Sequence, residues 1–297
     1  MPTDSKELTT CSTRLYCSMP KRPRMRLLVC SEIDAASVNM RDKLLALAEW
    51  REGEPFEGKP TYSQEDMRLI IIGQEHLYRD DLDEIAASFF GEKPEMLTYL
   101  SRHRSESGLR SLTVHPIGNH RQADFGGRPR TLVPSAPAHM TGALRALKET
   151  AKGLDYTVSF EATHHGPFLK TPTFFIEAGS DETAWSDDKA GEALANAVLK
   201  ATPAHGRVGI GVGGGHYMPR ISDVALSRDV CFGHMIPSYV LDEFDESILE
   251  NALSQTAKAE FVYFHRKAIS KPMLRRLEDW FTGRGIKVVR EEDLPPL

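Results

Sequence analysis

Short apolar runs of strand length alternate along this chain with segments that have a helical period. The apolar runs predict strands at residues 25–30, 68–73, 111–119, 155–162, 171–179, 207–215, 259–265 and 286–289. The intervening segments predict helices at 37–50, 81–90, 139–152, 182–201, 247–256 and 271–281. Because helices that alternate with buried strands cover both faces of a sheet, we expect a three-layer α/β/α fold with a mostly parallel or mixed central sheet.

Residues 25–297 contain neither an internal repeat nor an interdomain linker, so we expect a single α/β domain over that range. Residues 1–24 are polar, lack the apolar core of a secretory signal and end in a basic cluster. We interpret them as a flexible extension, or as the result of a start assigned too early, with Met25 as the working first residue. The chain has four cysteines without a CxxC pair, which is typical of free thiols in a reducing cytosol: Cys11, Cys17, Cys30 and Cys231.

The charge of the chain restricts how it could bind nucleic acid. The net charge is −5, so such a partner would need a local basic patch. One candidate lies between residues 102 and 130, where six arginines and two acids give a local charge of +4. This segment could contact phosphates, or it could be an ordinary solvated basic face. No apolar run approaches the roughly 20 residues that cross a bilayer, and we expect a cytoplasmic monomer without a membrane partner.

Polar side chains follow several of the predicted strands directly. They occur at residues 31–34, 115–119, 161–166 and 213–216. In open α/β sheets, ligands bind at the carboxyl ends of strands. The sequence therefore predicts that the functional site is assembled from these strand ends.

The segment FEATHHGPF places Glu161, His164 and His165 where a strand ends. Neutral imidazoles can bind a metal ion, with the carboxylate as a third ligand or as a group that orients a ligand. Alternatively, Glu161 and one histidine could transfer protons. Because adjacent side chains diverge, two metal ions, or one ligand and one acid or base, fit this spacing best. Histidines with ordinary hydrogen bonds remain the alternative.

The segment GIGVGGGHYMPR contains a literal GxGxxG pattern, but no obvious helix follows it and no acid stands at the distance that a dinucleotide site requires. The amides of Gly213, Gly214 and Gly215 could instead face an oxyanion. His216 is then a candidate ligand or acid/base group, although a glycine-rich turn with a structural histidine would look the same. His115 and His234 are weaker candidates.

Four quoted segments together, FEATHHGPF, TPTFFIEAGSDETAW, GVGGGHYMPR and VHPIGN, resemble the D-aminoacyl-tRNA deacylases of archaea and plants, the second class of these enzymes. The resemblance covers essentially residues 25–297. It implies an enzyme that hydrolyses the ester between a D-amino acid and the 3′ end of tRNA. It also implies dependence on zinc, and a fold similar to those of peptidyl-tRNA hydrolases and nucleoside phosphorylases.

On this basis we assign roles to individual residues. The predicted zinc ligands are His164, His165 and His216. The predicted catalytic residues are Glu161, His165 and His234. Substrate contacts are predicted for His115, Asn119, Gly213, Gly214, Gly215 and Arg220, and tRNA contacts for Arg102, Arg104, Arg121, Arg128 and Arg130.

Three other functions use the same residues differently. A zinc hydrolase of a small amide or peptide would need the histidines and Glu161 but no basic patch. A tRNA-binding protein without catalysis would need the basic patch and only structural histidines. A deacylase that uses a histidine without metal, as peptidyl-tRNA hydrolases do, would contain no zinc.

Overall fold

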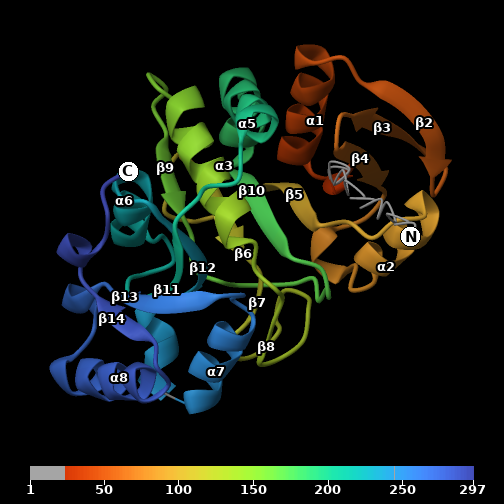
Figure 1. Ribbon diagram of the computed structural model, residues 1–297. Helices are drawn as coiled ribbons and strands as arrows, with labels where there is room; N and C mark the ends of the chain where they lie inside the picture. The colour runs from red at the N-terminus through yellow and green to blue at the C-terminus, as the bar shows by residue number, and fades with distance from the viewer. Residues whose placement is uncertain (1–23, 244) are drawn as a thin grey trace, which may run out of the picture.

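The computed structural model describes residues 24–243 and 245–297, which form two main sheets and the helices that cover them (Figure 1). The first sheet has eight strands in the order β2-β3-β4-β1-β5-β10-β6-β9. Its strands are β1 (Arg26–Ser31), β2 (Arg51–Phe56), β3 (Lys59–Gln64), β4 (Met67–Ile72), β5 (Met96–Arg102), β6 (Ser111–Pro116), β9 (Thr157–Phe160) and β10 (Thr173–Gly179).

The second sheet has four parallel strands in the order β12-β11-β13-β14. They are β11 (Arg207–Val212), β12 (Val230–Ile236), β13 (Ala259–Phe264) and β14 (Lys287–Val289). A small pair, β7 (Gly118–Asn119) and β8 (Thr131–Leu132), lies in the long loop that follows β6.

The helices alternate with these strands along most of the chain. They are α1 (Ala35–Leu47), α2 (Leu82–Phe90), α3 (Pro137–Thr150), α4 (Glu182–Trp185), α5 (Asp188–Lys200), α6 (Pro219–Ser227), α7 (Glu246–Ser254) and α8 (Lys271–Gly283). Short 3-10 turns occur at His76–Tyr78, Ser238–Glu243, Arg266–Ala268 and Glu291–Asp293.

The two faces of the eight-stranded sheet are covered by different helices. Side chains alternate along β1, so Leu28 and Cys30 join the core formed with α1, α3 and α5, whereas Leu27 and Val29 face α2. Helix α3 also packs on β12 of the second sheet, as Figure 1 shows, and therefore joins the two sheets. The mixed, mostly parallel α/β class is confirmed, but the expected single central sheet is replaced by two.

Several elements were not predicted from the sequence, among them β2, β3, β5, β12 and α6. Strand β5 contains threonine, serine and arginine, and β12 is interrupted by Gly233 and His234, so neither reads as a continuous apolar run. The expectation that no helix follows the glycine loop is wrong, because α6 begins at Pro219. Proline suits the first turn of a helix, where its missing N–H has no intrahelical partner.

Some expectations concern parts of the chain that the structure does not describe. The predicted N-terminal extension, except for Arg24, lies outside the described residues, and so do Cys11 and Cys17. Cys30 and Cys231 are buried free thiols. Within the described ranges, no helix is long and apolar enough to cross a membrane. The single domain over residues 25–297 stays a prediction.

Gly209 allows the central strand of the second sheet to pack closely against its neighbour. A Cβ atom added there would lie 2.2 Å from the ring of Phe261. We expect Gly209→Ala to lower the free energy of unfolding by roughly 1–3 kcal/mol, because two rigid strands must separate. Urea unfolding measures this loss. Gly283→Ala is the control, since nothing lies within 4 Å of its added Cβ, and a loss of stability as large as that of Gly209→Ala would contradict the packing argument.

Candidate functional site

The site is built where the β6–β9 edge of the large sheet meets the second sheet. In the antiparallel pair of β10 and β6, Glu177 lies opposite Thr113 and Phe175 lies opposite His115. Side chains two residues apart point to the same face, so Glu177 and His115 are diagonal neighbours on one surface. Both are buried, and Glu177 Oε2 lies 3.5 Å from His115 Nε2.

The segment after β9 runs between the two sheets. Glu161 donates its N–H to the carbonyl of Val114 in β6 of the large sheet at 3.1 Å, and the next two residues bond to the second sheet and the loop after β11. Ala162 donates its N–H to the carbonyl of His216 at 2.8 Å, and Thr163 donates to the carbonyl of Met235 at 2.9 Å. Bridges between backbones also pair Glu161 with Tyr217 and His164 with Ile117. These contacts bring residues that lie far apart in the chain to one place.

Glu161 is the second buried carboxylate of the site, and three imidazoles surround it. Glu161 Oε2 lies 3.0 Å from His216 Nε2 and 3.7 Å from His164 Nε2. Its other oxygen lies 3.3 Å from His103 Nδ1. His103 Nδ1 is also 3.6 Å from Glu177 Oε2, so this ring lies between the two carboxylates.

The neighbouring imidazoles determine the protonation state of the two buried carboxylates. Burial alone would raise the pKa of Glu177, but His115 and His103 hold that pKa well below its usual value. Burial likewise opposes ionisation of Glu161, whereas His216 and His103 lower its pKa. For His103 and His115, burial would lower the pKa, but the carboxylates raise it above the ordinary value. The site therefore favours ionised carboxylates beside imidazoles that bind protons readily.

For the adjacent histidines, His164 and His165, the surroundings lower the pKa instead of raising it. Burial and the neighbouring imidazoles of His115, His165 and His216 lower the pKa of His164 well below its ordinary value. Burial and His115 lower the pKa of His165 to about 4. Both rings are therefore neutral at pH 7, which is the form of histidine that binds metal ions.

Several donor atoms in the cluster converge without hydrogen bonds. Within the described residues, both carboxylate oxygens of Glu161 and the Nε2 atoms of His115 and His216 are buried without a hydrogen-bond partner. Buried polar atoms are normally paired, and an ion or water is a common reason for an exception. Three groups of three residues each bring their donor atoms within 4.8 Å of one another: His115, His164 and His165; His103, Glu161 and His216; His115, Glu161 and Glu177. Nitrogen and carboxylate donors in this arrangement fit a divalent metal such as zinc.

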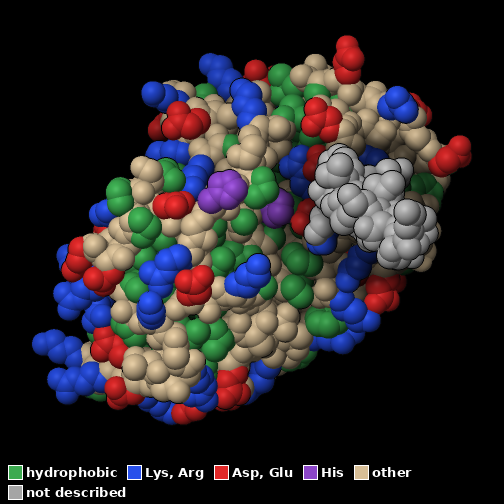
Figure 2. Space-filling view, viewed as in Figure 1, with side chains coloured by type: hydrophobic (Ala, Val, Ile, Leu, Met, Phe, Trp, Pro, Cys, Tyr) green, Lys and Arg blue, Asp and Glu red, His purple; other side chains and the backbone are tan. Residues whose placement is uncertain are grey.

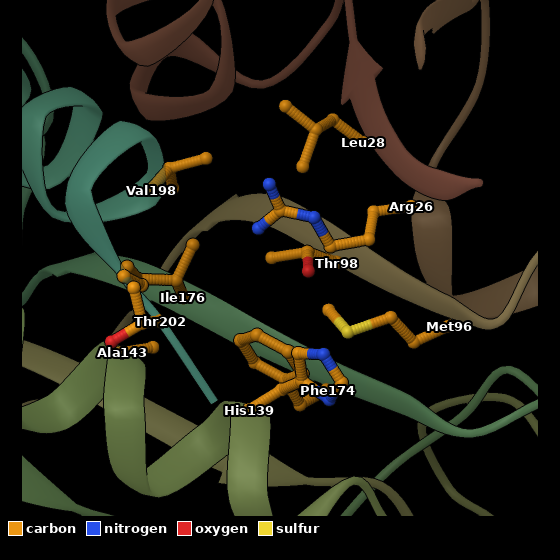
Figure 3. A pocket seen from close by; sticks show the side chains of 11 residues that line it. Arg26, Leu28, Met96, Thr98, His139, Ala143, Phe174, Ile176, Val198 and Thr202 are labelled. Atoms are coloured by element: carbon orange, nitrogen blue, oxygen red, sulfur yellow. The ribbon is translucent and has the colours of Figure 1, made fainter. Parts of the chain in front are cut away.

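The cluster opens into a cavity of about 410 Å³. Besides site histidines and Glu177, its walls include Asp34, Glu75, His76, Leu77, Ser101, Arg102, Arg104 and Phe125. Histidine side chains reach the surface near the middle of the face shown in Figure 2. A second cavity, shown in Figure 3, lies among Leu28, Met96, Phe174 and Val198 and measures only about 20 Å³, which is too small for a substrate.

The structure brings together five of the predicted site residues: His115, Glu161, His164, His165 and His216. It does not bring His234 to them. Its Nε2 donates to the carbonyl of Val133 at 2.9 Å, and its Nδ1 accepts from the hydroxyl of Thr163 at 3.1 Å. The catalytic role predicted for His234 is therefore withdrawn, because both ring nitrogens of this fully buried side chain are used to hold the segment next to His164.

The predicted substrate contacts outside the histidines also change. Gly213 donates its N–H to the carbonyl of Ile236, and Gly214 donates to Ser238 Oγ, so neither amide points at an oxyanion. The substrate contact predicted for Gly215 stays a prediction. The amide of Asn119 binds the carbonyls of Gly126 and Arg128 and fixes the long loop. Arg220 pairs with Glu291 and lines a different cavity.

The six arginines of residues 102–130 do not form one free basic patch. Arg102, Arg104, Arg110 and Arg130 pair with Glu75, Glu182, Asp187 and Asp245 respectively. Arg121 binds the carbonyls of Tyr239 and Val240, and Arg128 lies 3.8 Å above the ring of Phe168. Only Arg102 and Arg104 line the cavity beside the histidines. The other predicted tRNA contacts, Arg121, Arg128 and Arg130, have structural partners instead.

Three residues of the site were missed in the sequence. His103 lies between the two arginines that were noted for their charge, and Glu177 lies within the strongly apolar strand β10. Tyr217 Oη lies 3.0 Å from His103 Nε2 and extends the network. An acid inside an apolar strand was the available signal for Glu177, because an isolated buried carboxylate needs a partner.

The fold and the site together define an α/β protein whose buried carboxylates and imidazoles are suited to metal-assisted or acid–base hydrolysis. The family model of the D-aminoacyl-tRNA deacylases matches residues 90–289. The chain belongs to this family, and the resemblance noted in the sequence is confirmed.

Individual relatives support the same assignment. A D-aminoacyl-tRNA deacylase of Methanosarcina acetivorans is 36% identical over 90% of this chain and 92% of its own length. That of Pyrococcus furiosus is 36% identical over 90% of this chain and all of its own length. The chain spans 57% of the length of the Methanococcoides burtonii relative. A crystal structure of a conserved protein of unknown function superposes with a TM-score of 0.84, at 30% identity over 92% of this chain and 97% of that one.

The buried His234 predicts how stability depends on pH. Burial lowers its pKa to about 3, whereas the unfolded chain has the ordinary value of about 6.5. Protonation therefore favours the unfolded state, and stability is lost as the pH falls below about 6.5. In His234→Gln, the slope of unfolding free energy against pH near pH 5 should be smaller by about 1.4 kcal/mol per pH unit. Urea unfolding at several pH values measures both slopes, and equal slopes would contradict the neutral buried ring.

Proposed function

We propose that this protein hydrolyses the ester that joins a D-amino acid to the 3′ end of tRNA, releasing the amino acid and the tRNA. The observation that carries the proposal is the pair of buried carboxylates, Glu161 and Glu177, surrounded by imidazoles at the end of an open cavity. Membership of the deacylase family supports this choice of substrate.

We propose zinc as the cofactor. His164, His165 and His216 would hold it, with Glu161 as a further ligand or as the group that orients His216. The ring centroid of His164 lies 4.4 Å from that of His165 and 4.6 Å from that of His216, although the three do not form one of the donor groups described above. Bound there, zinc would supply Lewis acidity and lower the pKa of a coordinated water toward about 7. His115 completes one of the donor groups around His164 and His165 and therefore competes with His216 as a ligand.

The chain's own residues perform the proton transfers. Glu161 and Glu177 are held ionised and can accept the proton of an attacking water. His103 lies within 3.6 Å of both carboxylates and can carry that proton from one to the other.

The leaving group is a ribose hydroxyl, which departs most easily when it receives a proton. His103 has a raised pKa and lines the cavity, so it can pass a proton from the carboxylates to the leaving hydroxyl. Tyr217 Oη lies 3.0 Å from Nε2 of this ring and helps to orient it. Arg102 and Arg104 on the cavity wall provide positive charge for the terminal phosphate of the tRNA.

A direct assay separates this function from the alternatives. Charged tRNA carrying D- or L-tyrosine is incubated with the protein, with and without a chelator, and the release of amino acid is measured. We expect release from D-tyrosyl-tRNA only, and loss of release with the chelator. Release that the chelator does not affect would indicate the metal-free mechanism, and hydrolysis of small amides with no action on charged tRNA would indicate the other zinc hydrolase.

Single substitutions test the site itself. His164→Ala, His216→Ala and Glu161→Gln should each lower kcat/KM by roughly 100-fold to 10,000-fold, as expected for loss of a ligand or a general base. The zinc content of the purified variants should fall for the two histidine changes. His205→Ala is the matched control, because His205 is exposed and outside the cluster. Unchanged turnover in all three site variants would exclude this site.

A further inference from the structure

A third cavity, larger than the other two and called the hollow below, lies where the parallel strands of the second sheet end. It measures about 700 Å³, within the range of ligand-binding sites. Its walls come from the carboxyl ends of β13 and β14 and from α6. Ligands of open α/β sheets bind at this edge, and the site described above does not use this part of the sheet.

The hollow is basic although the whole protein is acidic. Only two acids line it, Glu291 and Glu292. Five cationic side chains line it as well: Arg220, Arg228, Arg266, Lys267 and Arg290. Figure 2 shows Lys and Arg side chains along the edge of the molecule where β13, β14 and α8 lie, with acidic side chains among them.

The acids neutralise this charge only in part. Glu291 alone pairs with both Arg220 and Arg228, and Arg228 Nε is buried without a hydrogen-bond partner among the described residues. Arg266 pairs with Glu278 at 2.6 Å, whereas Lys267 pairs with no carboxylate among the described residues. Arg290 approaches Glu292 only to 3.8 Å, and both side chains are mostly exposed, so solvent weakens that pair.

The hollow adjoins the histidine site through the glycine loop. Arg220 follows His216 by four residues on the same segment, and a Cβ added to Gly214 would lie 3.5 Å from His265 Nδ1 on the wall of the hollow. His265 therefore lies against the loop that carries His216, at a position where glycine leaves it room. The segment 216–220 therefore borders both sites, with His216 on the wall of the histidine cavity and Arg220 on the wall of the basic hollow.

We propose that this basic hollow binds the phosphates of the single-stranded 3′ end of tRNA while the ester lies at the histidine site. The inference rests on the proposed deacylase function. In this proposal the basic hollow, and not the arginines of residues 110–130, is the main contact with tRNA. Tyr263 and Phe264 are buried, so their rings cannot stack on bases, and the contacts are made to the backbone without regard to base sequence.

A double charge reversal tests the proposal without touching the histidine site. Lys267→Glu with Arg290→Glu should weaken the binding of uncharged tRNA by roughly tenfold at moderate salt and reduce the slope of log affinity against log salt by about 2. KM for charged tRNA should rise while kcat stays unchanged. The control is Arg51→Glu with Lys152→Glu, which makes the same change of net charge at exposed residues of β2 and the turn after α3.

A shortened tRNA locates the contact. tRNA without its last three nucleotides should bind the native protein weakly, and the double reversal should weaken its binding no further. If the double variant binds intact tRNA with native affinity and salt slope, or no more weakly than the control variant does, the proposal is overturned. Thermal unfolding of both variants verifies that each is folded.

The outcomes also separate this inference from the proposed function. A native protein that binds tRNA through the hollow but releases no D-amino acid would refute the deacylase activity and leave the hollow as a tRNA site. A double variant that deacylates as the native protein does, with unchanged KM, would refute the hollow and leave the activity.

Discussion

The site depends on two negative charges that are kept in the interior. Glu161 and Glu177 are almost completely buried, and an isolated carboxylate in such a place would take up a proton rather than stay charged. Imidazoles on all sides prevent this, with His103 between the two carboxylates. The imidazoles that stabilise these charges are also the groups that can bind a metal ion or carry protons. The need to keep two buried carboxylates ionised and the proposed chemistry therefore depend on the same residues.

The junction of two sheets explains why these groups converge. A single sheet would present the ends of β5, β9 and β11 at separate positions along one edge. Here the segment after β9 is bound to both sheets, through the amide of Glu161 to Val114 in β6 and through that of Thr163 to Met235 in β12. His234 has its place in this arrangement as a support, since it binds the hydroxyl of Thr163 from the neighbouring strand.

Much of the chemistry was visible in local patterns. Histidines next to glycine and proline at the ends of apolar runs identified His164, His165 and His216, because such turns expose polar groups at an edge of a sheet. His103 and Glu177 could not be found in this way. An acid inside an apolar strand marks Glu177 only as unusual, and no local pattern marks His103. These two residues are 74 positions apart in the chain and become neighbours because β5 pairs with β10, and Tyr217 reaches His103 from 114 residues away.

The sequence by itself determined the α/β class, most helices and strands, the family and the turns that carry the adjacent histidines, since each depends on short-range periodicity or on a motif. The tertiary structure decided what lies beside what. It divided the sheet in two, gave the arginines of residues 102–130 their partners, and removed two glycine amides from the site by bonding them elsewhere. Pairing between distant strands and the neutralisation of charge depend on long-range contacts, which no local pattern of residues records.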